Sequence, residues 1–158
     1  MKFLKRLFVF FSFRPRLQLL FIEAFVLLGW ARILKAKPFL EVAPKLGMKM
    51  EETSISNRSN REVIVNIASA VNAMSRHTFW ESMCLVKAIA AMKMLERRQI
   101  ESTLYLGTAK DENGKLIAHA WLRSGPYFLT GSEEMKKFTV VAMFAKKMSS
   151  RYEGEAYE

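Results

Sequence analysis

Residues 78–95, TFWESMCLVKAIAAMKML, contain Cys84, the single cysteine of the sequence. From Leu85 onward this stretch is rich in Ala, Leu, Met and Lys, which are good helix formers. Ser82 is a residue type that favours the N-cap position. The stretch therefore predicts a helix that begins at Cys84. Apolar residues at helical spacing give this helix one buried face: Leu85, Ile89, Met92 and Leu95.

The position of Cys84 makes it a candidate nucleophile. A thiol in the first turn of a helix lies beside unpaired backbone N–H groups and the positive end of the helix dipole. Both favour the thiolate, which is the nucleophilic form. A lone cysteine among apolar residues is also a common small core residue, so the role of Cys84 depends on what the rest of the chain supplies.

Composition limits the remaining possibilities. The chain has 158 residues, enough for one compact domain with a sizeable core. One cysteine excludes an intramolecular disulfide and favours the reducing cytoplasm. One cysteine and two histidines are too few ligands for structural zinc, and we expect neither metal nor cofactor. The net charge of +10 suits anionic lipid or an acidic protein. No nucleic-acid-binding motif is present in the sequence, so nucleic acid is not an expected partner.

The N-terminal part, residues 1–50, is predicted to be an apolar helical segment. Its main helix covers Arg16–Lys35 and ends before Pro38. Glu23 lies at the middle of this helix, where a bilayer-spanning helix is expected to be uncharged. We expect a buried or groove-filling helix, with peripheral contact with a membrane surface as the alternative.

The central part contains a second helix, after a polar connector at Glu51–Asn60. This helix is predicted over Arg61–Met74, with Asn60 as a candidate cap. Its apolar residues form one stripe at helical spacing: Val63, Ile67, Ala70, Val71 and Met74.

After the cysteine helix the apolar period changes from helical spacing to alternation. Four strands are predicted, with a strong turn signal at Asp111–Gly114 between the first two. They cover Ser102–Ala109, Lys115–Arg123, Tyr127–Thr130 and Phe138–Phe144.

The predicted fold class is α+β, in which N-terminal helices precede a cysteine-bearing helix packed on a four-stranded antiparallel meander. We place the core at residues 51–146. Residues 147–158 form a charged tail that we expect to be disordered.

His119 is the first candidate base for Cys84. It lies in the middle of the second strand between Ala118 and Ala120, and shares a strand face with Trp121. If that face meets the start of the cysteine helix, the imidazole can take the thiol proton and later protonate the leaving amine. The alternative is a half-buried histidine satisfied by a backbone group. His77, in the loop before Cys84, is the rival base.

Several segments together carry a resemblance to a known family: Trp80–Leu95, Gln99–Gly107, Ala118–Trp121, Leu129–Ser132 and Phe138–Ala142. They resemble the B2 proteins of lasso peptide biosynthesis, which are transglutaminase-like, papain-related cysteine proteases. The resemblance implies a transglutaminase-like or papain-like core, with Cys84 as the nucleophile and His119 as the general base.

The resemblance also implies a reaction and partners. A B2 protein is a leader peptidase that cleaves the leader from a ribosomally made precursor peptide. A small B1 protein binds the leader and delivers the precursor, and an ATP-dependent macrocyclase then closes the ring. The N-terminal apolar helix and the aromatic side chains either form a docking face for B1 or bury one another.

The third catalytic residue is where this sequence departs from the family pattern. Transglutaminase-like triads carry an aspartate on the strand after the histidine, but Tyr127–Gly131 contains no acid. We assign Glu133 as the orienting acid, with Glu134 and Thr130 as alternatives. The missing aspartate leaves a second function open, a non-catalytic scaffold or binding module of the same biosynthetic complex. Two tryptophans are candidates either for the walls of a substrate groove or for core packing: Trp80 and Trp121.

Overall fold

The computed structural model describes residues 14–56, 60–78 and 83–148 and has an α+β fold. The described part contains four α-helices: α2 (Pro15–Lys35), α3 (Phe39–Leu46), α4 (Arg61–Ser75) and α5 (Cys84–Glu96). It also contains five strands: β1 (Met48–Lys49), β2 (Ser102–Lys110), β3 (Leu116–Ser124), β4 (Tyr127–Thr130) and β5 (Thr139–Lys146). A short 3₁₀-helix, η1, covers Met135–Lys137. The α+β prediction is confirmed, with one strand more than the four predicted.

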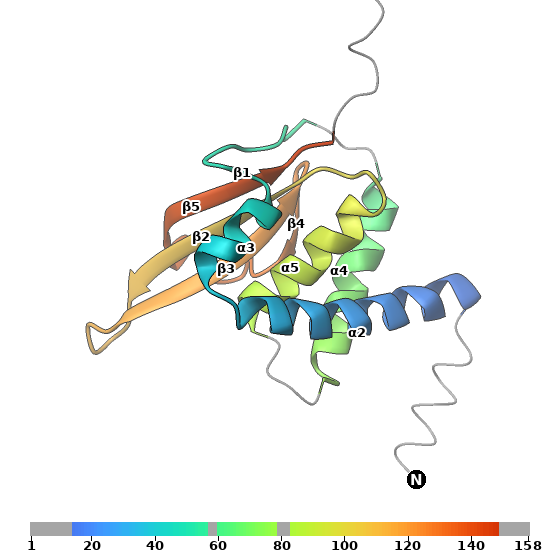
Figure 1. The fold of residues 1–158 in the computed structure, drawn as a ribbon, viewed down its shortest axis with the longest axis horizontal. Coiled ribbons are helices and arrows are strands. Elements are labelled where there is room, and N and C mark those ends of the chain that lie inside the picture. The colour runs from blue at the N-terminus through green and yellow to red at the C-terminus, as the bar shows by residue number, and fades with distance from the viewer. Residues whose placement is uncertain (1–13, 57–59, 79–82, 149–158) are drawn as a thin grey trace, which may run out of the picture.

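The cysteine helix α5 is the central element. It packs against β2, β3 and β4 on one side and against α2 on the other, with α4 beside it (Figure 1). The expectation that α5 packs on the sheet is confirmed. The prediction of a single buried face is too narrow, because α5 buries side chains around its circumference, including Val86, Ala88, Ile89, Ala91 and Met94.

The sheet has the strand order β1-β5-β2-β3-β4, and the strand pairs described are antiparallel. Strands β2, β3 and β4 form the predicted meander. The last strand departs from the meander, because residues 131–138 carry the chain back across the sheet and β5 pairs with β2. The added strand, β1, pairs its two residues with Ala145 and Phe144 at the outer edge of β5.

The two faces of the sheet have different coverings. Leu104, Ala120 and Leu122 belong to the hydrophobic cluster that also contains the buried side chains of α5. Because side chains alternate along a strand, Tyr105 and Trp121 point to the opposite face. Their rings stack there, with centroids 5.6 Å apart. The helices therefore cover one face, and an aromatic pair occupies the other.

A buried arginine organises the face opposite the helices. Arg123 donates hydrogen bonds to the Tyr105 hydroxyl oxygen at 2.8 Å and to the Thr53 carbonyl at 3.0 Å. The Tyr105 hydroxyl in turn donates to the Glu52 carboxylate. Burying a charged group is favourable only when its donors are satisfied, and these bonds tie the connector before α4 to the sheet.

The long helix α2 is held by a burial seam and by ion pairs. Its Ala24, Leu28 and Ala31 side chains are fully buried. Glu23 forms ion pairs with Arg98 at 2.6 Å and with Arg97 at 3.1 Å, both just after α5. By length and composition alone α2 is apolar enough to cross a membrane. Because core helices of soluble proteins can be equally apolar, this property is consistent with either a soluble or a membrane-associated protein.

Several helix boundaries differ from the prediction. The N-cap of α5 is Met83 rather than Ser82, which lies outside the described residues. Asn60 precedes α4 in a left-handed conformation, and its side chain makes no capping hydrogen bond. The helix α3 was not predicted as a separate element, although it lies within residues 1–50, which were predicted to be helical. The described part of the predicted tail 147–158 is limited to Lys147 and Met148.

Candidate active site

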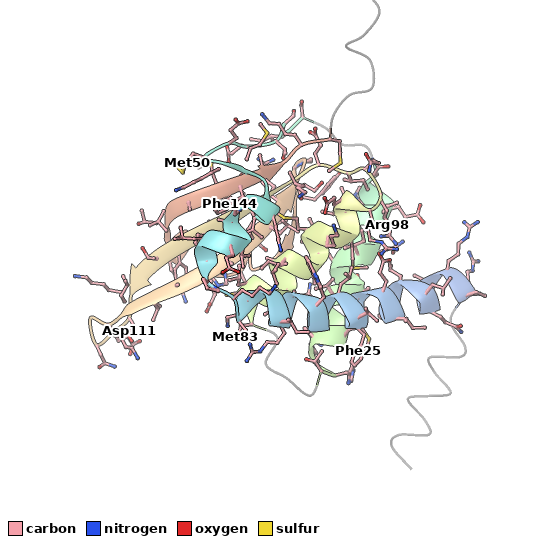
Figure 2. All side chains as sticks on the ribbon, in the orientation of Figure 1. Phe25, Met50, Met83, Arg98, Asp111 and Phe144 are labelled. Carbon is pink, nitrogen blue, oxygen red and sulfur yellow. The ribbon has the colours of Figure 1, made fainter. Side chains whose placement is uncertain are left out.

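Cys84 is the first residue of α5, as predicted, and its side chain is half-buried against the hydrophobic cluster. The first hydrogen bond along this helix runs from the Lys87 N–H to the Met83 carbonyl at 3.0 Å. The N–H groups of the first turn therefore have no acceptor within the helix. Met83 lies beside the end of α2, with its sulfur 3.9 Å from the Lys35 ammonium (Figure 2). Trp80 lies outside the described residues.

His119 is in β3, opposite Gly107 of β2, and is partly exposed. Its Nε2 atom lies 2.8 Å from the Gly131 carbonyl oxygen. Because a carbonyl oxygen only accepts, Nε2 carries the hydrogen and Nδ1 is the basic nitrogen of the neutral ring. The Phe138 ring lies against the imidazole, with centroids 4.9 Å apart. A backbone carbonyl and the Phe138 ring thus help to hold the imidazole.

Gly131 is the residue of this site that sequence reasoning missed. It has a positive φ of 72°, which favours glycine. A Cβ at this position would lie 2.4 Å from the Ala120 carbonyl oxygen and 3.1 Å from His119 Nε2. Gly131 therefore lets the chain pass close to the imidazole. In the sequence, Gly131 stands out only as a glycine directly after a predicted strand. No neighbouring residue indicates that it lies beside His119.

Cys84 and His119 are on different sides of β3. Ala120 belongs to the cluster against which Cys84 packs, so the neighbouring His119 points to the opposite face. On that opposite face, Gly131 and Phe138 lie against the imidazole. No hydrogen bond joins the thiol and the imidazole among the interactions of the described residues. Their catalytic pairing stays a prediction.

Among the described residues, none of the candidates for the third catalytic residue makes a hydrogen bond or an ion pair with His119. Glu133 and Glu134 are exposed, and Glu134 pairs with Lys137 at 3.7 Å. Thr130 is buried, and its hydroxyl has no hydrogen-bond partner among the described residues. The role of Glu133 therefore remains a prediction, while the Gly131 carbonyl occupies one ring nitrogen.

Trp121 is a packing residue in this structure. Its side chain is 4% exposed and lies between Tyr105 and His119, with a centroid distance of 5.9 Å to the imidazole. Of the two roles considered for Trp121, core packing therefore agrees better with its burial than a place in the wall of an open groove.

The rival base His77 follows α4. Its N–H donates to the Met74 carbonyl at 2.9 Å, and the residue is exposed. Residues 78–83 connect this end of α4 to the start of α5, and α4 packs beside α5. His77 is therefore on the helical side of the sheet, as Cys84 is.

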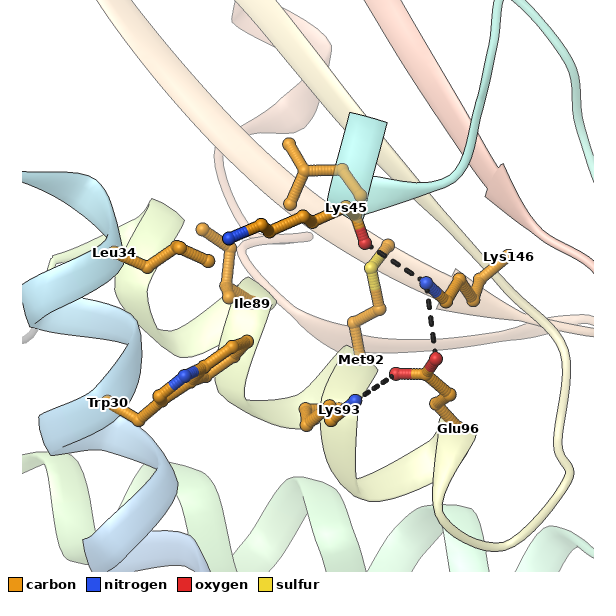
Figure 3. A pocket seen from close by; sticks show the side chains of 9 residues that line it. Trp30, Leu34, Lys45, Ile89, Met92, Lys93, Glu96 and Lys146 are labelled. Carbon is orange, nitrogen blue, oxygen red and sulfur yellow. Dashed lines mark hydrogen bonds and ion pairs between the residues drawn. The ribbon is translucent and has the colours of Figure 1, made fainter. Parts of the chain in front are cut away.

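Two cavities formed by described residues lie apart from these candidates, since neither is lined by Cys84 or His119. One, of about 240 Å³, lies between α2, α5 and the end of α3. At its rim, Glu96 accepts from Lys93 at 2.8 Å and pairs with Lys146 at 3.2 Å (Figure 3). Burial opposes ionisation of the Glu96 carboxyl, but the two lysines outweigh it and lower its pKa below the usual 4.5.

The lowered pKa predicts a pH-dependent effect for Glu96→Gln. Glu96 binds protons more weakly in the folded state than in the unfolded state. Its contribution to the free energy of unfolding is therefore fully present above the unfolded-state pKa and is lost as the pH falls through the folded-state pKa. We expect the variant to lose less than about 1 kcal/mol of unfolding free energy near neutral pH. The difference should be smaller at about pH 3, which is below the usual pKa of a glutamate. Urea denaturation at both pH values measures it.

Glu112→Gln is the matched control, because Glu112 is exposed in the β2–β3 turn. We expect it to leave the unfolding free energy unchanged at both pH values. A Glu96→Gln loss that persists undiminished in acid would contradict the ion-pair explanation.

The fold and the candidate residues define an α+β domain with a cysteine at the start of a central helix that packs on an antiparallel sheet carrying a histidine. Residues 24–143 match the transglutaminase-like superfamily, and the chain belongs to that superfamily. Domains of this kind often have cysteine protease activity. Comparison with curated proteins and with solved structures gave no match.

Proposed function

We propose that this protein is a cysteine peptidase that removes the leader from a ribosomally made precursor in lasso peptide biosynthesis. The observation that carries the proposal is Cys84 at the first residue of α5, within a chain of the transglutaminase-like superfamily. The likeness of the sequence to the B2 proteins supports the narrower assignment to leader removal.

Cys84 is the nucleophile of the proposed reaction. Its sulfur attacks the carbonyl carbon of one peptide bond, and the N–H groups of the first turn of α5, which have no acceptor within the helix, can stabilise the oxyanion. The imidazole takes the thiol proton as the sulfur attacks and then gives it to the leaving amine, so the leader remains as a thioester on the sulfur. Water then attacks the thioester and gives one proton to the imidazole, and the leader acid leaves. The imidazolium returns that proton to the thiolate, which restores the thiol and the neutral imidazole.

His119 is the proposed base because it matches the histidine of the family motif, and its protonated Nε2 leaves Nδ1 basic. The proposed reaction requires the imidazole and the thiol to meet in the precursor-bound state. The proposed partners are a leader-binding B1 protein, which delivers the precursor, and an ATP-dependent macrocyclase, which uses the amine that cleavage releases.

The single cysteine provides a direct test, since iodoacetamide can alkylate only one thiol in this chain. The chain is alkylated alone, freed of reagent and then mixed with precursor and B1. We expect complete alkylation to lower the cleavage rate at least about tenfold, because a thioether is not a nucleophile. Mass spectrometry of the leader and core peptides gives the rate, and that of the chain gives the alkylated fraction.

The control is the same chain carried through without reagent. Residual activity should follow the unmodified fraction, and precursor with B1 should slow the alkylation. A fully alkylated chain that still cleaves at the original rate would exclude Cys84 as the nucleophile.

The alternative proposal is a non-catalytic scaffold or binding module of the same complex. The position of His119 on the sheet face away from α5 favours this alternative, as does the lack of an acid contact to its imidazole among the described residues. Such a module would bind the precursor or B1 without cleaving it. In the alkylation assay above, neither the alkylated chain nor the untreated chain would then release any product.

A further inference from the structure

The helix α2 has apolar side chains on two faces, and the described part of the chain covers one of them. Ala24, Leu28 and Ala31 are fully buried against α4 and α5. Figure 1 shows α2 on the side of the molecule away from the sheet. The opposite face of the helix carries a row of large apolar side chains, here named the outer stripe, that are 38–67% exposed: Leu19, Ile22, Val26, Trp30 and Ile33.

The outer stripe continues along the helix at intervals of three or four residues, so its members lie on one face. A helix that is apolar all round is normally buried all round. Single exposed apolar residues are ordinary, but a contiguous row on one helix marks a contact surface.

The charges around the outer stripe identify what it contacts. Arg14 and Arg16 are exposed at the start of α2, and Lys35 and Lys37 are exposed at its end. The one acidic residue within α2, Glu23, is held by its arginine partners Arg97 and Arg98. The outer stripe is thus bordered at both ends by positive charge, which complements anionic phospholipid headgroups.

The packing of α2 decides how it meets a bilayer. Crossing the membrane would require Leu28 and its neighbours to leave the protein core, and would place Glu23 near the middle of the hydrocarbon. Lying in the plane of the surface keeps the inner face packed and buries only the exposed row. Trp30, an aromatic residue suited to the interface, belongs to that row.

We propose that the outer stripe is a membrane-binding surface that lies in the headgroup region of an anionic bilayer, with the flanking arginines and lysines on lipid phosphates. The proposal is independent of the peptidase assignment. It places the start of α5 near the bilayer, because Lys35 contacts Met83, the residue before Cys84.

Vesicle co-sedimentation of the full chain tests the proposal, with phosphatidylcholine vesicles containing phosphatidylglycerol compared with phosphatidylcholine alone. We expect binding to the anionic vesicles. The double variant Ile22→Ser/Ile33→Ser should bind them at least about tenfold more weakly, because two large side chains no longer enter the bilayer. Arg14→Gln/Arg16→Gln should weaken binding to the anionic vesicles.

Ile55→Ser/Leu116→Ser is the matched control. These side chains are 62% and 68% exposed and belong to the segment before α4 and to β3 rather than to α2, so vesicle binding should stay within twofold. Circular dichroism confirms that each variant is folded.

Three outcomes would overturn the proposal. One is that the full chain does not bind anionic vesicles. The second is that Ile22→Ser/Ile33→Ser binds as well as the original chain. The third is that this variant turns a dimer into a monomer in light scattering while its vesicle binding is unchanged, in which case the outer stripe is an interface between copies.

Discussion

Replacing Cys84 with alanine is expected to lower the rate of precursor cleavage about 10³-fold or more in the presence of B1. The variant lacks the only thiol of the chain, and the proposed reaction cannot form its thioester without one. Only binding and the backbone N–H groups of α5 would remain, and they give small residual rates in enzymes that lose their nucleophile. Timed mass spectrometry of the released leader measures the effect.

Met83→Ala is the matched control for this prediction. Met83 is adjacent to Cys84, exposed, and makes no side-chain capping bond as the N-cap of α5. We expect it to cleave within about twofold of the original rate. Cys84→Ser should be as folded as the original chain and strongly impaired, which separates loss of the thiol from loss of packing. Cleavage by Cys84→Ala at the original rate would exclude Cys84 as the nucleophile.

Local chemistry explains which parts of this fold could be predicted. The β2–β3 hairpin was predicted because its signals lie within a few residues of one another. Asp111 accepts hydrogen bonds from the N–H groups of Asn113 and Lys115, and Gly114 has a positive φ of 77°. The start of α5 at Cys84 likewise follows from helix formers after a polar loop.

The missed elements depend on distant parts of the chain. The strand β1 has two residues, too few to show alternation, and exists because it pairs with Phe144 and Ala145. The helix α3 contains Pro44, a residue that locally argues against a helix interior. Its Val42 and Leu46 are nevertheless buried in the core, so tertiary packing outweighs the local preference.

The candidate site shows the same limit more sharply. Alternation along β3 correctly grouped His119 with Trp121 and separated them from Ala120 and Leu122. It could not decide which group faces α5, because that choice depends on where the helix and the 131–138 crossover pack. Periodicity assigns residues to two faces, and only the tertiary contacts assign a partner to each face.

The second large effect is expected from the base. His119→Ala should lower the cleavage rate about 10²-fold, the usual contribution of a general base, whereas His77→Ala should change it less than about threefold. The family motif favours His119, and the Gly131 carbonyl leaves its Nδ1 basic. His77 lies on the same side of the sheet as Cys84. Comparing the two variants therefore decides which histidine is the general base.

His119→Gln separates chemistry from structure, because the glutamine amide can still donate to the Gly131 carbonyl. We expect this variant to keep the fold and to lose cleavage as His119→Ala does. If His77→Ala is the inactive variant instead, the base belongs to the helical side, and His119 is a structural residue held by Gly131 and Phe138. If both histidine variants cleave normally, the reaction does not use a Cys–His pair. The pH–rate profiles of the two variants identify the base, because the variant that has lost it also loses the corresponding limb of the profile.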